Sequence, residues 1–218
     1  MINIMKMYEL NGFEYPSVTS IIHLISLNDG LMQWANYMGF KRKDIKAIQN
    51  ESTAFGTLMH EYLRGEVDPR YTKRIPYNVF EAKRINDVLD NFRPKYQKSK
   101  LKTIDTEMTI ISPSMGYGGT LDWLCEKDNE IILSDFKTSK AVHSTMFLQL
   151  GAYSLLLKKE KNIIVDKASI IIANKNKCAF YPINRVTLDL YEDLFKMLLS
   201  FFVRWNHIKC QGVMEEDL

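Results

Sequence analysis

The segment from residue 117 to residue 153 places the strongest constraint on how this chain can fold, because charged residues stand in it at strand spacing. The run Ile131–Lys137 is apolar and β-branched in its first part, which predicts a strand. Side chains on a strand alternate between its two faces, so Asp135 and Lys137 share one face while Phe136 points to the other. We therefore expect a carboxylate and an ammonium side by side on a rigid element.

A second strand is predicted just upstream, over Thr120–Glu126, and the short polar turn of residues 127–130 would make the two strands antiparallel neighbours. Asp122 would then lie across from Asp135. Two carboxylates a few ångströms apart repel each other unless a cation lies between them, and oxygen ligands of this kind suit Mg²⁺ or Mn²⁺. Taken alone, Asp135 and Lys137 would favour a solvated surface ion pair, which is common and weak. The metal interpretation therefore depends on further residues.

Helical periodicity follows over Val142–Lys158 and places Gln149 and Tyr153 one turn apart on the same face. The Gln149 amide both donates and accepts hydrogen bonds, and the Tyr153 ring carries a hydroxyl group. The pair therefore suits a phosphate or a terminal base. A partly buried helix face explains the same two residues equally well.

A histidine further upstream offers a nitrogen ligand. Residues 54–63 belong to a longer helical pattern, in which Gly56 permits the close approach of another backbone and His60 lies one turn later. A lone helical histidine is more often an ordinary core or surface residue. Beside two carboxylates, however, a neutral imidazole would complete the ligand shell of a cation, and nitrogen favours Mn²⁺ over Mg²⁺ somewhat.

The length of 218 residues suits a single domain with a sizeable core. We expect a mainly helical part over about residues 1–100, a sheet core over 103–185 and a C-terminal helix over 187–210. One helix should end near Pro94, and Thr187 should cap the last helix. Three cysteines without a C-x-x-C motif argue against a disulfide framework and a cysteine zinc site. Without a membrane-length apolar segment or a secretory signal, a cytoplasmic, non-secreted protein is expected.

The net charge of +3 is too small to demand a nucleic-acid partner, but the basic residues are clustered. Lys95, Lys98 and Lys100 stand in a run from residue 93 to residue 102 that contains no acidic residue. Such runs are usually solvated surfaces, although phosphate contact needs only loosely placed lysines. We treat the three lysines as candidate substrate-binding residues.

Four short motifs carry a resemblance to a known family. They are GTLMH at 56–60, GGTLD at 118–122, DFK at 135–137 and QLGAY at 149–153. In this order and spacing they resemble the pattern G-x-x-x-H, G-x-x-D, (D/E)-x-K and Q-x-x-x-Y of the PD-(D/E)xK nucleases of the RecB exonuclease type. The opening YPSVTS at 15–20 is also similar to the start of mitochondrial genome maintenance exonuclease and its phage relatives.

The resemblance implies an α/β fold, with a mixed, twisted central β-sheet flanked by helices, a restriction-endonuclease-like core and a helical N-terminal region. It implies one or two Mg²⁺ or Mn²⁺ ions. An iron–sulfur cluster is not expected, because the branch of the family that holds one needs four cysteines. Lys137 would orient the attacking water, and Gln149 and Tyr153 would place the DNA strand. The implied metal ligands are His60, Asp122, Asp135, the backbone carbonyl of Phe136 and, as a second-tier ligand, Glu107.

The implied activity is phosphodiester hydrolysis by a DNA exonuclease of phage or cellular recombination, repair or replication, acting on single-stranded DNA or duplex ends. A helicase or annealing protein could deliver the DNA. The chain has no G-x-x-x-x-G-K-[ST] loop, so an ATP-driven motor would be another protein. Two alternatives stay open: a structure-specific or nicking endonuclease, and a noncatalytic DNA-binding or assembly module that retains the fold.

Overall fold

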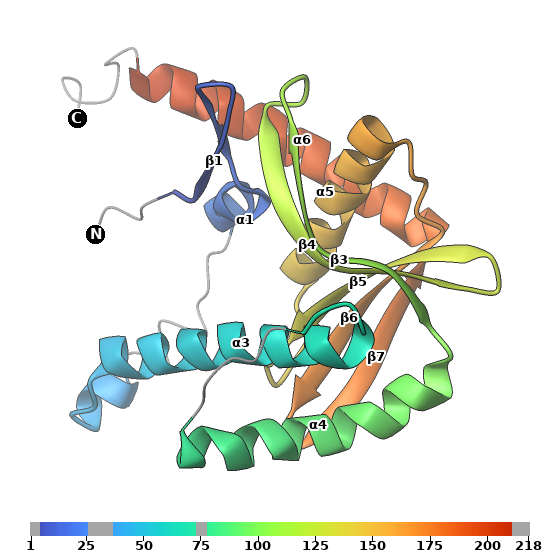
Figure 1. Cartoon of the computed structure of the whole chain (residues 1–218). Coiled ribbons are helices and arrows are strands. Elements are labelled where there is room, and N and C mark those ends of the chain that lie inside the picture. Colours follow the sequence, from blue (N-terminus) through green and yellow to red (C-terminus); the bar gives the residue numbers. More distant parts are fainter. Residues whose placement is uncertain (1–4, 26–36, 73–77, 211–218) are drawn as a thin grey trace.

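A five-stranded mixed sheet forms the centre of the computed structural model, which describes residues 5–25, 37–72 and 78–210 (Figure 1). Its strands are β3 (Lys102–Ser112), β4 (Tyr117–Lys127), β5 (Glu130–Lys137), β6 (Lys167–Asn174) and β7 (Lys177–Asn184). They lie in the order β3-β4-β5-β6-β7, and each neighbouring pair is antiparallel except the parallel pair β5 and β6. The predicted α/β fold with a mixed central sheet is confirmed, and the arrangement is consistent with a restriction-endonuclease-like core.

The connections between strands explain this order. β4 and β5 are joined through Asp128 and Asn129, whose φ angles of 53° and 66° are those of a two-residue hairpin turn. The parallel neighbours β5 and β6 need a crossover connection, and helix α5 (Ser144–Lys161) supplies it. A second hairpin between β6 and β7 then completes the sheet. Both hairpins predicted from polar turns are present.

Helices cover both faces of the sheet (Figure 1). Helix α1 (Val18–Ile22), α5 and α6 (Arg185–Cys210) share one apolar cluster with the sheet. Helices α3 (Ile45–Val67) and α4 (Val79–Ser99) share a second cluster with the opposite face. The sheet is therefore the middle layer between two groups of helices.

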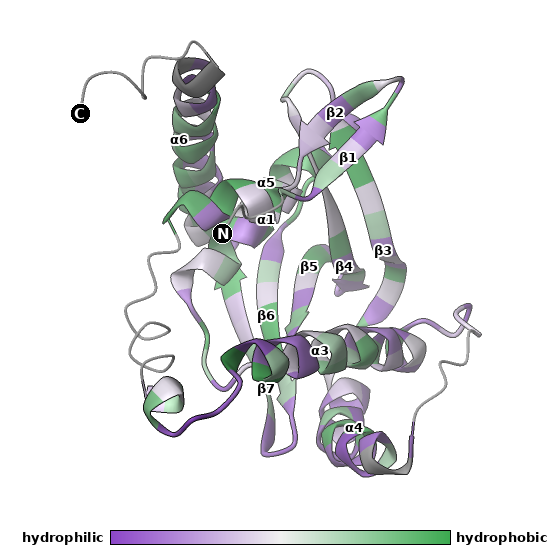
Figure 2. Cartoon of the chain, turned by 90° about the vertical axis from the view of Figure 1, so that its left-hand side faces the viewer, coloured by the Kyte–Doolittle hydropathy of each residue, from purple (hydrophilic) through white to green (hydrophobic). Residues whose placement is uncertain are grey.

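The N-terminal residues form a small separate hairpin. Strands β1 (Met7–Leu10) and β2 (Phe13–Pro16) pair with each other, and the 3-10 turn His23–Ile25 follows α1. Figure 2 shows this hairpin beside β3 and β4, at the end of the sheet away from α3 and α4. Within the described ranges, no helix has the length and apolar character needed to cross a membrane.

Aromatic packing fixes the central strands to the helices. The rings of Trp123 and Phe136 stack with centroids 5.7 Å apart, and Phe92 of α4 meets Phe136 edge-on at 5.9 Å. On the other face, α5 is buried continuously over residues 150–157, so it forms an inner layer between the sheet and α6. Phe136 thus points away from α5, as the strand alternation predicts.

The end of α4 and the cap of α6 differ from the sequence prediction. Helix α4 does not end near Pro94 but continues to Ser99. Pro94 deprives the carbonyl of Asp90 of its helical partner, and both residues are exposed. Tyr96 stacks on Phe92 at 5.7 Å, which supports the helix beyond the proline. The last helix begins at Arg185, and its cap is not Thr187: the Thr187 N–H donates to Oδ1 of Asn184 at 2.9 Å.

Candidate active site

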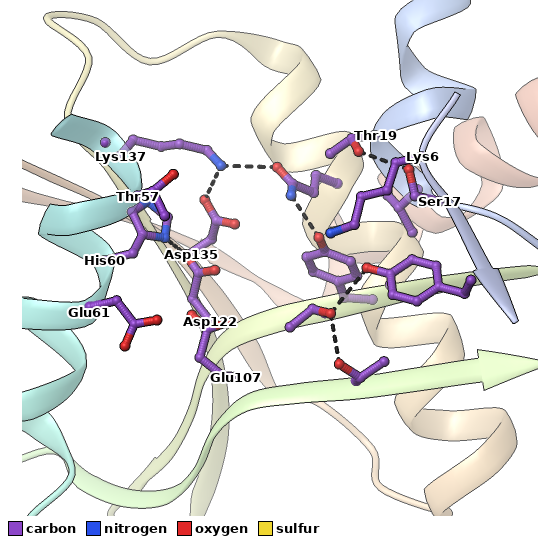
Figure 3. Close-up of a pocket in the computed structure, with 18 residues that line it drawn as sticks. Lys6, Ser17, Thr19, Thr57, His60, Glu61, Glu107, Asp122, Asp135 and Lys137 are labelled. Atoms are coloured by element: carbon purple, nitrogen blue, oxygen red, sulfur yellow. Dashed lines mark hydrogen bonds and ion pairs between the residues drawn. The ribbon is translucent and has the colours of Figure 1, made fainter. Parts of the chain in front are cut away.

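A polar cavity of about 570 Å³ lies where β4 and β5 separate, between α3, α5 and the N-terminal hairpin (Figure 3). The β4–β5 ladder stops at the pair Trp123–Ser134. The next step of this register places Asp122 opposite Asp135. Oδ2 of Asp122 accepts a hydrogen bond of 2.8 Å from the N–H of Phe136. Where the ladder ends, this carboxylate therefore replaces a backbone carbonyl as the partner of the Phe136 N–H.

Three side chains on different elements converge on one side of the cavity. His60 extends from α3, and its Nδ1 lies 3.3 Å from Oδ2 of Asp122. Glu107 extends from β3, opposite Asp122 in the β3–β4 register. One ligand atom from each of His60, Glu107 and Asp122 lies within 4.8 Å of the others. A nitrogen and two carboxylate oxygens at this spacing can hold a single divalent cation.

The backbone of Glu107 is in an unfavourable conformation. Its φ of 52° lies in the left-handed region, which costs a non-glycine residue roughly 1–2 kcal/mol. The preceding residue, Thr106, is anchored: its hydroxyl donates to Asp68 at 2.8 Å and accepts from Nε of Arg64 at 3.0 Å. Strain that is held in place by surrounding contacts is a frequent feature of functional sites. Here it turns the Glu107 carboxylate toward Asp122.

Asp135 is the most deeply buried acid of the cavity, with 1% of its side chain exposed. Its Oδ2 lies 2.6 Å from Nζ of Lys137, whereas its Oδ1 accepts no hydrogen bond from any described residue. Burial raises the pKa of Asp135 to about 6, although Lys137 acts to lower it. A buried carboxylate oxygen without a partner is costly, so the site has an unused ligand for a cation.

Lys137 lies at the centre of a chain of hydrogen bonds. Its Nζ donates to Oε1 of Gln149 at 3.1 Å, and Nε2 of Gln149 donates to the Tyr153 hydroxyl at 2.8 Å. Burial acts to lower the pKa of Lys137, but Asp135 and Asp122 together outweigh burial, and the pKa is raised. Burial also raises the pKa of Tyr153 well above its ordinary value. The cavity therefore presents a fixed ammonium and a neutral phenol.

The remaining acids and the histidine are mutually coupled. Burial acts to lower the pKa of His60, but the charge and hydrogen bond of Asp122, together with the charge of Asp135, raise it to about 9. Burial acts to raise the pKa of Asp122, yet His60 and Lys137 lower it. Burial, assisted by Asp122, raises the pKa of Glu107 to about 7. Several strongly shifted groups around one cavity mark a candidate functional site.

The structure brings most of the predicted site residues together but not the basic cluster. His60, Asp122, Asp135, Lys137, Gln149, Tyr153 and Glu107 all line the cavity. Lys95 and Lys98 lie on α4, on the other face of the sheet, and Lys100 follows its end. None of these lysines lines the cavity. For Phe136, the contact to the site is its N–H to Asp122, and a ligand role for its carbonyl stays a prediction.

The far half of the cavity comes from residues that sequence reasoning missed. Lys6, just before β1, and Tyr8 of β1 line it together with hydroxyl groups of β3 and β4. The Tyr8 hydroxyl lies 3.1 Å from Oγ1 of Thr120, which lies 2.8 Å from Oγ1 of Thr109. Figure 3 shows Lys6 on the side of the cavity opposite His60. Ser17 and Thr19 of the YPSVTS motif also line the cavity, so this motif was the signal in the sequence that could have pointed to the N-terminal residues.

No protein-family model and no curated protein matches this chain. Among solved structures, it is similar to a candidate exonuclease from Eubacterium rectale at 11% identity and a TM-score of 0.48, over 70% of this chain and 66% of that one. It is also similar to LHK-Exo, an alkaline exonuclease from Laribacter hongkongensis, at 10% identity and a TM-score of 0.39, over 91% and 94% of the two chains. The chain thus spans just under two thirds of the first of these proteins. At TM-scores below 0.5 these likenesses assign no activity, so function is argued from the side chains.

Proposed function

We propose that this protein is a metal-dependent deoxyribonuclease that removes nucleotides from DNA ends. The observation that carries the proposal is the buried Oδ1 of Asp135, which has no partner among the described residues and lies in the same cavity as a ready set of ligands. A divalent cation satisfies such an oxygen, and His60, Glu107 and Asp122 offer it further ligand atoms.

The residues present fit Mg²⁺ or Mn²⁺. Asp122, Asp135 and Glu107 supply the hard carboxylate oxygens that both ions prefer, and the His60 nitrogen shifts the preference toward Mn²⁺. We include the Phe136 carbonyl as a further ligand, and a second ion is compatible with the number of carboxylates. When bound, the metal polarises a phosphoryl oxygen and lowers the pKa of a water molecule.

The protein's own groups would position the phosphate and stabilise charge. Lys137 is held between Asp135 and Gln149, so its ammonium points in a fixed direction into the cavity. A preorganised cation of this kind offsets the negative charge that develops on a phosphoryl oxygen during hydrolysis. Gln149 and the neutral Tyr153 hydroxyl are linked to each other and would orient the strand near the scissile bond.

The size of the cavity supports action at an end. Its volume of about 570 Å³ is that of a small-ligand pocket, and α3, α5 and the β1–β2 hairpin surround it. A space of this kind suits the terminal nucleotides of one strand better than a continuous double helix. The four motifs support DNA as the substrate, and a role in phage or cellular recombination, repair or replication belongs to the same proposal.

The test compares end-labelled linear DNA with covalently closed circular DNA of the same sequence, each incubated with Mn²⁺ or with EDTA. The wild-type protein should release nucleotides from the linear DNA with Mn²⁺ only, and Asp122→Asn should release none. Nicking of the circles would support a structure-specific or nicking endonuclease instead. Binding of DNA without any cleavage would favour a noncatalytic module.

A further inference from the structure

A second cavity, of about 420 Å³, adjoins the cavity of the candidate active site, which we call the catalytic cavity from here on. We name it the basic groove; it is lined by Phe55, Arg84, Lys140, Asn174, Lys175 and Asn176, with Ser52, Val88 and Thr138. These residues come from α3, α4, the loop after β5 and the β6–β7 turn. Figure 1 shows the β6–β7 end of the sheet between α3 and α4.

The two cavities meet along consecutive residues of two segments. On α3, Gly56 lines the catalytic cavity and Phe55 lines the basic groove. After β5, Lys137 lines the catalytic cavity and Thr138 lines the groove. A Cβ on Gly56 would lie 3.8 Å from Oγ1 of Thr138, so the two segments are close here without being tightly packed. The two cavities are therefore neighbours along α3 and along the segment that follows β5.

The charge of the groove is positive and largely uncompensated. Arg84 forms an exposed ion pair with Glu51 at 2.9 Å, which is a weak interaction in water. In the described part of the chain, Lys140 and Lys175 form no ion pair, and no acidic side chain lines the groove. Lysines without carboxylate partners attract phosphate groups.

The groove also holds an arginine stacked on an aromatic ring. The guanidinium carbon of Arg84 lies 3.9 Å from the ring centroid of Phe55, so the two groups are in close cation–π contact. An aromatic ring with an arginine beside it is a common stacking platform for single-stranded nucleic acid, because every base has a face to stack. The side-chain amide of Asn176 adds a hydrogen-bonding group to the lining.

The segments that carry the lysines are held together by hydrogen bonds. Nδ2 of Asn174 donates to the Ser139 carbonyl at 2.9 Å, which ties the turn bearing Lys175 to the loop bearing Lys140. Nδ2 of Asn91 on α4 donates to the Lys175 carbonyl at 3.1 Å. The positive charges of the groove are thus mounted on a connected scaffold, unlike the lysines at the end of α4, which lie outside both cavities.

We propose that the basic groove binds the single-stranded DNA segment adjoining the cleavage site, with phosphates against Lys140 and Lys175 and a base on the Phe55–Arg84 platform. This inference rests on the proposed nuclease function and names the path of its substrate. The groove should therefore contribute to the binding of long strands, and it should not affect substrates that are short enough to fit inside the catalytic cavity.

The test compares Lys140→Ala/Lys175→Ala with the control Lys159→Ala/Lys161→Ala, which removes two exposed lysines of α5. Binding of a fluorescent 12-nucleotide dT strand is measured in EDTA over a range of salt concentrations. Each phosphate contact on single-stranded DNA contributes about 0.7 to the slope of log K against log salt, so the groove variant should lose about 1.4 and the control nothing. Equal slopes for both variants would overturn the inference.

Two further measurements separate this inference from the proposed function. Phe55→Leu keeps an apolar side chain but removes the stacking face, and it should weaken binding of the same strand by about fivefold or more. Hydrolysis of the dinucleotide dTpdT with Mn²⁺ should stay at the wild-type rate in the Lys140/Lys175 variant. If the wild-type protein hydrolyses dTpdT and both groove variants bind the strand as tightly as the wild type, the groove proposal is refuted and the nuclease proposal is not. If the wild-type protein hydrolyses no DNA, the nuclease proposal is refuted.

Discussion

Lys137 is expected to support cleavage without binding the metal. Its ammonium faces Asp135 and Gln149 but donates no lone pair to a cation. Lys137→Ala should therefore lower the cleavage rate by about 10²- to 10³-fold, the usual effect of removing one preorganised charge-stabilising donor. Its affinity for Mn²⁺ should not fall. Single-turnover cleavage and calorimetric Mn²⁺ titration provide the two readouts.

Asp135→Asn serves as the matched comparison for Lys137→Ala. It removes a carboxylate from the cavity, so cleavage and Mn²⁺ affinity should both fall. If Lys137→Ala cleaved DNA at the wild-type rate, the assigned role of the lysine would be wrong.

Gly119 is required by the position of Tyr153. A methyl group at residue 119 would overlap Cε1 of Tyr153 and lie 3.0 Å from its Cδ1 and 3.1 Å from Cγ2 of Val18. Gly119→Ala should displace the Tyr153 ring, break its hydrogen bond with Gln149 and reduce cleavage, with a destabilisation of about 1–3 kcal/mol from overpacking. Urea unfolding and cleavage assays measure the two effects. Wild-type activity in this variant would show that the Tyr153 position is not critical.

At this scale the sequence predicts relations within an element better than contacts between elements. Strand alternation places Asp135 and Lys137 on one face, and helical spacing places Gln149 and Tyr153 on another, because both depend only on local geometry. Lys6 enters the cavity through the pairing of a distant hairpin with the sheet. No local periodicity contains that information.

Among the elements, the contact between α5 and α6 depends on Gly151. A Cβ there would lie 2.7 Å from the backbone carbon of Tyr191, and backbone atoms cannot move aside as a flexible side chain can. Gly151→Ala should push the helices apart and destabilise the protein by about 1–3 kcal/mol. The free energy of unfolding in urea provides the measurement.

Gly65→Ala on α3 is the control for the same chemical change. Its Cβ would meet only Cδ1 of Tyr71, at the ordinary contact distance of 3.8 Å. Alanine is the better helix former, so this variant should be as stable as the wild type or more stable by up to about 1 kcal/mol. Equal destabilisation by both substitutions would contradict the proposed close packing of α5 on α6.

The type and order of the sheet-core elements follow from patterns in the sequence, whereas their ends depend on tertiary packing. The polar turns before β5 and β7 predict both hairpins. Helix α4, in contrast, continues past Pro94 because Tyr96 packs on Phe92 and the proline faces solvent. The cap of α6 shifts from Thr187 to Asn184, since either side chain is able to cap a helix.

For the whole molecule, the buried site predicts how stability depends on pH. The pKa values of Asp135, Glu107 and His60 rise from ordinary values of 3.8, 4.5 and 6.5 to about 6, 7 and 9. The folded state therefore holds more protons than the unfolded state between about pH 4 and pH 9, and the metal-free protein should lose stability as pH rises through this range. The lowered pKa of Asp122 acts only at more acidic pH. Urea unfolding at pH 5.5, 7.0 and 8.5 measures the slope.

Glu107→Gln isolates one part of this pH dependence. The amide does not titrate, so the variant should show a smaller loss of stability between pH 5.5 and pH 8.5 than the wild type. Mn²⁺ should stabilise the wild type more at pH 8.5 than at pH 5.5, because the carboxylates bind the metal in their deprotonated form. If the stability of the variant changed with pH as much as that of the wild type, Glu107 would not be one of the titrating groups.

The central claim is that one cation joins α3 to the β3–β4–β5 end of the sheet. The most direct measurement is a crystal structure of the protein soaked in Mn²⁺, with the ion located by its anomalous scattering. The peak should lie within about 2.0–2.4 Å of ligand atoms from Asp122 and Asp135, with His60 or Glu107 completing the shell. A protein that cleaves DNA with Mn²⁺ but shows no peak between these side chains would contradict the claim.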